Sequence, residues 1–174
     1  MKTDTKVSCE LGKTWRVERQ RPSECLLATL AALSGKPYWY VRSKAHHFLR
    51  EWYAQETDSI PAECTWERFA IGHRDPYRYA TECLTDLLGL QLISLSSSTP
   101  TGHDWTIPLH GQGYILFKHS GGSHIAPWRN GLIYDVGADD PMQGVTLSTY
   151  LTLNSFVVLT IRTTRMKEGT TNEL

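Results

Sequence analysis

The first half of the chain has the hydrophobic spacing of helices. After Pro22, leucine and alanine side chains recur at three- and four-residue intervals, with Ser23 as a possible N-cap and Gly35 as the C-terminal stop. Similar spacing covers about Trp39–Ala54, and a third pattern runs through about Tyr79–Leu88 and stops at a glycine. The sequence therefore predicts that its first half is mostly helical.

The second half changes to short runs of β-prone residues separated by turn residues. These runs are Leu90–Leu95, Tyr114–His119, His124–Trp128, Leu132–Val136 and Phe156–Ile161. Asn130-Gly131 stands between two of them and is a strong signal for a two-residue hairpin loop. Helices followed by strands predict an α+β fold with an antiparallel sheet.

The length of the chain fits one domain. It has 174 residues, and domains average about 150 residues. We expect a single domain over residues 1–162, with a helical lobe at about 20–89 and a sheet lobe at about 90–162. Small polar side chains dominate residues 163–174, and this composition predicts a flexible tail.

Charge and hydropathy narrow the possible partners. Lys plus Arg and Asp plus Glu each number 18, so 18 − 18 leaves no basic excess to neutralise nucleic acid or an acidic membrane. No apolar run is long enough for a membrane span or a signal peptide. We therefore expect a cytoplasmic protein with no nucleic-acid and no membrane partner, and the oligomeric state stays open.

The cysteines and histidines do not have the spacing of a metal site. Cys9, Cys25, Cys64 and Cys83 are too few and too scattered for a disulfide scaffold, and a cytosolic chain would keep them reduced. No Cys or His pair has the spacing typical of structural zinc. We expect neither a metal nor a cofactor.

Cys25 lies where the first helix is predicted to begin. If Ser23 is the cap, Cys25 is the second helical residue, where free N–H groups and the helix dipole stabilise a thiolate. A small buried side chain in a helix is the alternative. Upstream, the Gln20 amide could point at the same space as the Cys25 backbone N–H and form a two-donor oxyanion hole, although most such glutamines are solvated surface residues.

The hairpin predicts a pair of side chains. With Asn130-Gly131 as the loop, Ala126 lies opposite Asp135, and His124 becomes the diagonal neighbour of Asp135 on the same face. A carboxylate on one imidazole nitrogen fixes the tautomer and leaves the other nitrogen to take a thiol proton. The alternatives are a solvated strand histidine and a surface acid. The order of Gln20, Cys25, His124 and Asp135 favours a catalytic triad with an oxyanion hole.

These residues stand in segments that resemble the papain-like cysteine peptidases, most closely their C39-like branch. That branch has a glutamine, an acidic residue just before the cysteine, small residues along the helix and a second helix, features matched by Gln20–Gly35, Pro37-Tyr38 and Val41-Arg42. Its later strand, histidine strand and Tyr-Asp ending are matched by Gly113–Phe117, Gly121–Ala126 and Gly131–Asp135. The resemblance covers roughly Gln20–Pro141.

The resemblance implies a role for each residue. Cys25 would be the nucleophile and His124 the general base and acid. Asp135 would orient the histidine, and Gln20 would donate to the oxyanion. The chain departs from the family at Leu26, where a glycine is usual, and in a Gln-to-Cys gap about one residue shorter than the commonest.

The implied fold is papain-like, with the nucleophile helix packed against a C-terminal antiparallel sheet. The implied activity is hydrolysis of an amide or peptide bond in a peptide or protein substrate, through a thioester on Cys25. A protein deamidase or a transglutaminase-type acyl transferase would use the same triad. A catalytically silent binding module is the alternative from another class, and Leu26 is the residue that favours it.

Overall fold

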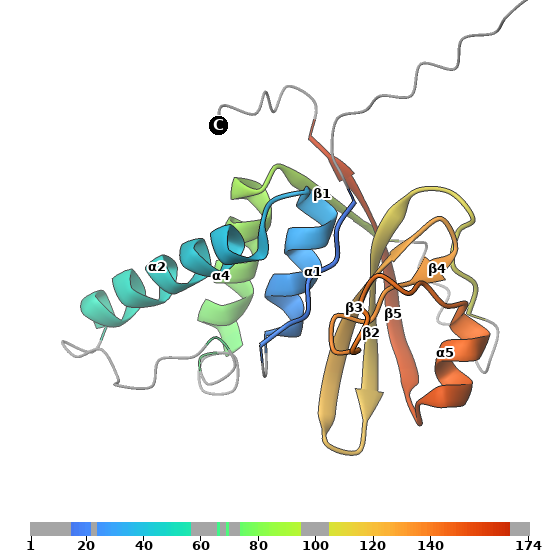
Figure 1. The fold of residues 1–174 in the computed structure, drawn as a ribbon. Coiled ribbons are helices and arrows are strands. Elements are labelled where there is room, and N and C mark those ends of the chain that lie inside the picture. The colour runs from blue at the N-terminus through green and yellow to red at the C-terminus, as the bar shows by residue number, and fades with distance from the viewer. Residues whose placement is uncertain are drawn as a thin grey trace, which may run out of the picture.

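The chain folds into an antiparallel sheet with helices on both faces (Figure 1). In this computed structural model, residues 15–21, 24–56, 66, 69, 74–94 and 105–167 are described. The helices are α1 (Cys25–Ser34), α2 (Tyr38–Glu56), α4 (Arg74–Leu87) and α5 (Leu147–Leu153). The strands are β1 (Leu90–Ser94), β2 (Gln112–His119), β3 (Gly122–Arg129), β4 (Leu132–Ile133) and β5 (Val157–Met166). The α+β class and the antiparallel sheet are confirmed.

Helix α1 is the central helix of the molecule. Every residue from Leu26 to Ser34 is buried, and the helix packs against α2 and against β3. It ends at Gly35, whose φ of 67° is the left-handed conformation that glycine adopts without strain. The predicted N-cap is corrected by one residue: Glu24 is the cap, Cys25 is the first helical residue, and Ser23 lies outside the described residues.

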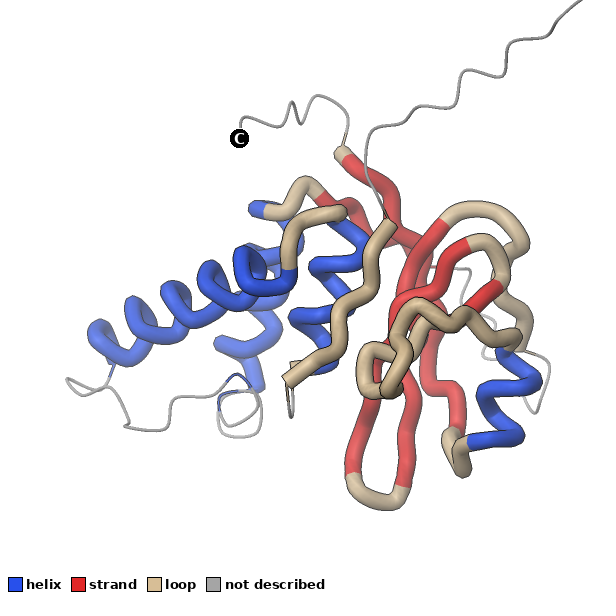
Figure 2. Tube along the Cα trace, in the orientation of Figure 1, coloured by secondary structure: helices blue, strands red, loops and turns tan. Residues whose placement is uncertain are grey.

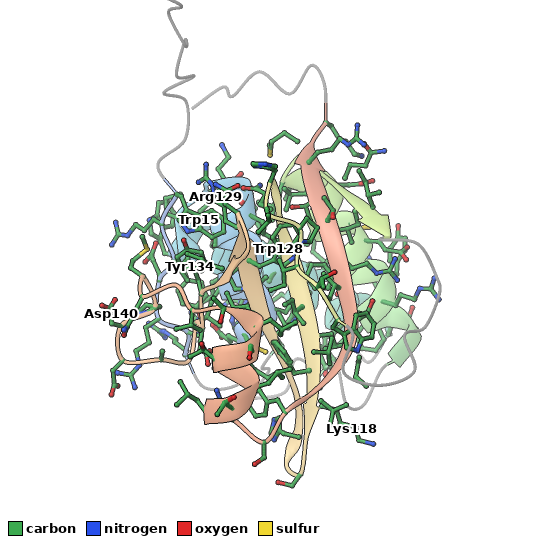
Figure 3. The ribbon with its side chains drawn as sticks, turned by 90° about the vertical axis from the view of Figure 1, so that its right-hand side faces the viewer. Trp15, Lys118, Trp128, Arg129, Tyr134 and Asp140 are labelled. Atoms are coloured by element: carbon green, nitrogen blue, oxygen red, sulfur yellow. The ribbon has the colours of Figure 1, made fainter. Side chains whose placement is uncertain are left out.

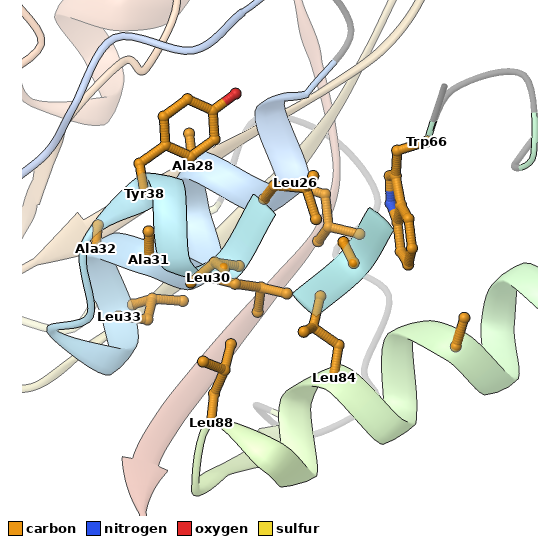
Figure 4. Close-up of a cluster of buried hydrophobic side chains, with 14 of the residues drawn as sticks. Leu26, Ala28, Leu30, Ala31, Ala32, Leu33, Tyr38, Trp66, Leu84 and Leu88 are labelled. Atoms are coloured by element: carbon orange, nitrogen blue, oxygen red, sulfur yellow. The ribbon is translucent and has the colours of Figure 1, made fainter. Parts of the chain in front are cut away.

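Helices α2 and α4 cover α1. The buried face of α2 includes Val41, Ala45 and Leu49, which repeat at four-residue intervals. Helix α4 begins at Arg74, five residues before the predicted start, and it brings Leu84 to the α1 leucines (Figure 4). Helical periodicity therefore located all three helices, with errors only at their ends.

The sheet has the strand order β1-β5-β2-β3-β4. The predicted hairpin loop is confirmed: Asn130 and Gly131 have φ values of 50° and 81°, and Arg129 pairs with Leu132. The predicted strand Leu132–Val136 is shorter than expected, because β4 ends at Ile133. Asp135 therefore lies two residues beyond the end of β4 and outside the ladder.

The second face of the sheet has a hydrophobic cluster of its own. Ile115 and Phe117 alternate along β2 with less buried residues, and they pack with Trp128 and with Tyr150 of α5 (Figure 3 labels Trp128). The strand pattern did not predict α5. Its N-cap is Thr146, whose side chain accepts a hydrogen bond from the Thr149 backbone.

The extended segment of residues 15–21, drawn as a loop in Figure 2, is fastened to the hairpin side of the molecule. The guanidinium of Arg129 lies 5.1 Å from the Trp15 ring centroid, and the Trp15 ring packs edge-on against Tyr134 at 5.4 Å (Figure 3). The backbone N–H of Gln20 donates to the Val136 oxygen at 2.8 Å. These contacts carry Gln20 to the segment that follows β4.

The predicted tail is corrected in its first part. Strand β5 extends to Met166, so residues 163–166 pair with β1. The predicted strand ended at Ile161, because the threonines that follow read as polar tail residues. Threonine is β-branched and suits a strand once a partner is present. Residues 168–174 lie outside the described part of the chain.

No helix within the described ranges is both long and apolar enough to cross a bilayer.

Candidate active site

Cys25 is held at the N-terminal end of α1. The first intrahelical hydrogen bond runs from Ala28 N to Glu24 O at 3.1 Å, so the N–H of Cys25 precedes the helical ladder. The Cys25 side chain is half-buried and forms no disulfide. A thiol in this position is close to the positive end of the helix dipole, which stabilises a thiolate.

The start of α1 is tied to the histidine strand. Thr29, one turn after Cys25, donates from Oγ1 to the Ile125 backbone oxygen at 3.4 Å. Ile125 is the residue after His124 in β3. The helix that carries the cysteine therefore packs on the strand that carries the histidine.

His124 and Asp135 form the pair that the hairpin predicts. Nε2 of His124 lies 2.9 Å from Oδ1 of Asp135, and the two side chains are only 13% and 21% exposed. The His124 ring also packs on Phe156, with 5.9 Å between ring centroids. The bond to Asp135 occupies Nε2, which leaves Nδ1 as the nitrogen for the thiol.

The charges of the site favour a protonated histidine. Burial alone would lower the pKa of His124, but hydrogen bonding to Asp135 and Cys25, together with their negative charges, raises it to about 9. The pKa of Asp135 is lowered despite its burial, first by the His124 bond and charge. Cys25 is therefore close enough to His124 to act on its titration, and an imidazolium stands beside the Asp135 carboxylate at neutral pH.

Two further groups hold the Asp135 carboxylate, and sequence reasoning missed both. The Gly137 N–H donates to Oδ1 at 2.8 Å, and the Tyr150 hydroxyl donates to Oδ2 at 2.7 Å. Burial, the charge of Asp135 and this bond raise the pKa of Tyr150 well above its usual range. With the His124 bond, three donors fix the carboxylate. No local pattern indicates Tyr150, because its helix has only seven residues.

Gln20 is brought to the same place. A Cβ added to Gly137 would lie 3.2 Å from Asp135 Oδ1, 3.5 Å from Gln20 Nε2 and 3.8 Å from His124 Cε1. These three side chains therefore surround Gly137. Oε1 of Gln20 is buried and has no hydrogen-bond partner within the described part of the chain. All four predicted residues thus converge on one site.

Leu26 does not enter this site. Its side chain is only 8% exposed and belongs to the hydrophobic cluster between α1 and its neighbours (Figure 4). Leu26, which stands where the resembled family usually has glycine, is therefore packed in the hydrophobic core.

The described cysteine and histidine side chains form no cluster around a possible metal position. In the described ranges, no group of three or more His, Cys, Asp or Glu side chains could hold an ion. Cys83 is inside α4, and Cys9, Cys64 and His73 lie outside these ranges.

Replacing Tyr150 with Phe should destabilise the protein by about 1.5–3 kcal/mol at pH 7, because a hydrogen bond to a charged carboxylate is lost. Urea unfolding measures the difference. The difference should shrink as the pH falls through the lowered pKa of Asp135, since a protonated carboxyl is a weaker acceptor. Tyr114→Phe, in β2, is the matched control and should change stability little. An equal loss in both variants would contradict a special role for the Tyr150 bond.

Comparisons with known proteins add no relatives. No protein-family model matches the chain, and no curated protein matches it significantly.

Proposed function

We propose that this chain is a papain-like cysteine hydrolase that cleaves an amide or peptide bond in a peptide or protein. The observation that carries the proposal is the buried His124–Asp135 pair, with Cys25 at a helix start acting on the same imidazole. A helix-start thiol, a base and an orienting carboxylate are the parts that nucleophilic acyl transfer needs. The packing of α1 on β3 supports the papain-like arrangement.

Before the reaction, the Cys25 proton has passed to His124, which gives a thiolate beside an imidazolium. In the first half of the reaction, the thiolate sulfur attacks the carbonyl carbon of the substrate. The carbonyl oxygen becomes an oxyanion, for which the Cys25 N–H and the Gln20 amide are the candidate donors. The C–N bond then breaks as His124 returns the proton to the leaving amine. A thioester on Cys25 remains.

In the second half, His124 takes a proton from water, and the hydroxide attacks the thioester carbonyl. The C–S bond breaks, the acid product leaves, and the thiolate of Cys25 remains beside the imidazolium of His124. Asp135 keeps Nε2 engaged throughout, so Nδ1 faces the reacting atoms at each proton transfer. Tyr150 and the Gly137 N–H hold Asp135 in this orientation.

A peptide library tests the proposal. The protein is incubated with peptides from a digested proteome, with Cys25→Ala as the matched control, and the products are read by mass spectrometry. We expect new peptide termini that appear only with the wild-type chain. Glutamine-to-glutamate changes or new cross-links that depend on Cys25 would instead identify a deamidase or an acyl transferase. If no product depends on Cys25, the proposed hydrolase is wrong and a binding module is the remaining function.

A further inference from the structure

A pocket of about 830 Å³ is lined by the chain before α1 and by residues of α2 from Tyr38 to Arg50. Its lining includes four permanently charged cations, Arg21, Arg42, Lys44 and Arg50. The lining includes none of Cys25, His124 and Asp135. We call it the cationic pocket, and it is separate from the reacting atoms.

The cationic pocket has a local charge excess in a chain with none overall. Glu18 lines it, and Glu24 contacts its Arg42, so 4 − 2 leaves two positive charges with neutral histidines. The whole chain has 18 − 18 = 0. The fold therefore gathers positive charge here that the composition does not reveal.

The carboxylates of Glu18 and Glu24 already accept hydrogen bonds from neighbouring groups. Glu24 is 5% exposed, and both of its carboxylate oxygens lie 3.0 Å from Nε of Arg42. Oε1 of Glu18 accepts from the Tyr38 backbone N–H at 3.2 Å. Within the described ranges, no carboxylate pairs with the exposed side chains of Arg21 and Arg50. Among the described residues, these two guanidinium groups therefore have no carboxylate that competes with an incoming anion.

Other lining residues fit a peptide better than a bare ion. Trp39 is 69% exposed and offers an apolar surface at the pocket. His46 also lines the pocket, with Nε2 3.7 Å from Oε1 of Glu24, and burial and then the charge of Arg42 lower its pKa, so it is a neutral donor or acceptor near pH 7. A ligand with carboxylates and an apolar portion would use both kinds of group.

The cationic pocket is connected to the start of α1, where Cys25 lies. Arg21 follows Gln20 directly, and the Arg21 backbone N–H donates to the Tyr38 hydroxyl at 3.2 Å. The Tyr38 hydroxyl in turn bonds Glu24, the residue before Cys25. Hydrogen bonds therefore link the pocket-lining Arg21 and Tyr38 to the residue that precedes Cys25.

We propose that the cationic pocket binds acidic side chains of a peptide substrate, close to the bond that Cys25 cleaves. This inference rests on the proposed function. Arginine suits the role because its planar guanidinium pairs with both oxygens of a carboxylate. Nucleic acid is less well matched, because it needs basic groups spread along a surface, and here they are confined to one pocket.

Binding tests the pocket independently of catalysis. In a Cys25→Ala background, isothermal titration measures an N-acetylated tetraglutamate amide against its tetraglutamine counterpart. We expect only the acidic peptide to bind, and more weakly as NaCl is raised. Arg21→Gln with Arg50→Gln should weaken it by about 10-fold or more. Arg78→Gln with Arg165→Gln removes the same charge elsewhere and should leave the affinity within about twofold.

Three results would overturn the proposal: no tetraglutamate binding, equal loss in both double variants, or tighter pocket-dependent binding of an octathymidylate strand than of the peptide. Failure of the pocket and failure of the hydrolase are distinguishable. If tetraglutamate binds through Arg21 and Arg50 but no library peptide is cleaved, the proposed role of the pocket is supported and the proposed hydrolase activity is contradicted. If peptides are cleaved without acidic residues near the cut and tetraglutamate does not bind, the hydrolase activity is supported and the proposed role of the pocket is contradicted.

Discussion

Replacing His124 with Ala should slow the alkylation of Cys25 by iodoacetamide about 10- to 100-fold at pH 6.5, because an unassisted thiol with a pKa of about 8.5 is only about 1% thiolate there. In the proposed thiolate–imidazolium pair of the wild-type protein, the cation of His124 would stabilise the thiolate. The pKa of His124 is raised to about 9, so this cation is present through the whole neutral range. Rates are measured by mass spectrometry of the modified cysteine.

The pH series gives the sign of the effect. Below about pH 9, the cation is present and the wild-type reaction should be faster. As the pH rises through about 9, His124 loses its proton, and the two rates should converge. Cys83, in α4, is an internal control whose rate should be the same in both proteins. If the Ala variant folds poorly, His124→Gln keeps more of the side-chain volume. Equal Cys25 rates at pH 6.5 in wild type and in a folded variant would contradict the thiolate–imidazolium pair.

The parts of this site that sequence could predict are those fixed by local signals. Asn130 and Gly131 adopt the positive φ values of a two-residue hairpin loop, and the register follows by counting from them. Continued past the end of β4, the same count places Asp135 near His124, although only Trp128–Ile133 and Arg129–Leu132 are pairs of the ladder. Gly35 ended α1 for a similarly local reason.

The parts that sequence could not predict depend on distant packing. Tyr150 reaches Asp135 because α5 covers the second face of the sheet, and no sequence pattern around Tyr150 indicates that contact. Strand β5 continues past Ile161 because β1 pairs with its threonines. The cationic pocket forms because α2 turns its basic residues toward Arg21, whereas the total charge of zero indicated no basic surface.

Replacing Gly113 with Ala should destabilise the protein by about 3 kcal/mol or more, because the sheet has no room for a side chain at this position. Gly113 is buried in β2 between Trp128 of β3 and Thr163 of β5. A Cβ there would lie 1.8 Å from the Arg162 backbone oxygen and 2.8 Å from Nε1 of Trp128. That nitrogen donates to the same oxygen at 3.1 Å, so both a strand and a buried hydrogen bond must shift.

Urea unfolding followed by tryptophan fluorescence measures the loss, with Gly121→Ala as the matched control. A Cβ at Gly121, in the β2–β3 turn, would meet only the His119 ring, at 3.3 Å, and that side chain can move aside. The control should therefore stay within about 1 kcal/mol of wild type. Wild-type stability in Gly113→Ala would mean that β2 does not pair with β3 and β5 in this register. Because β3 carries His124, the alkylation rate of Cys25 in the same variant would then show whether the site survives a shifted sheet.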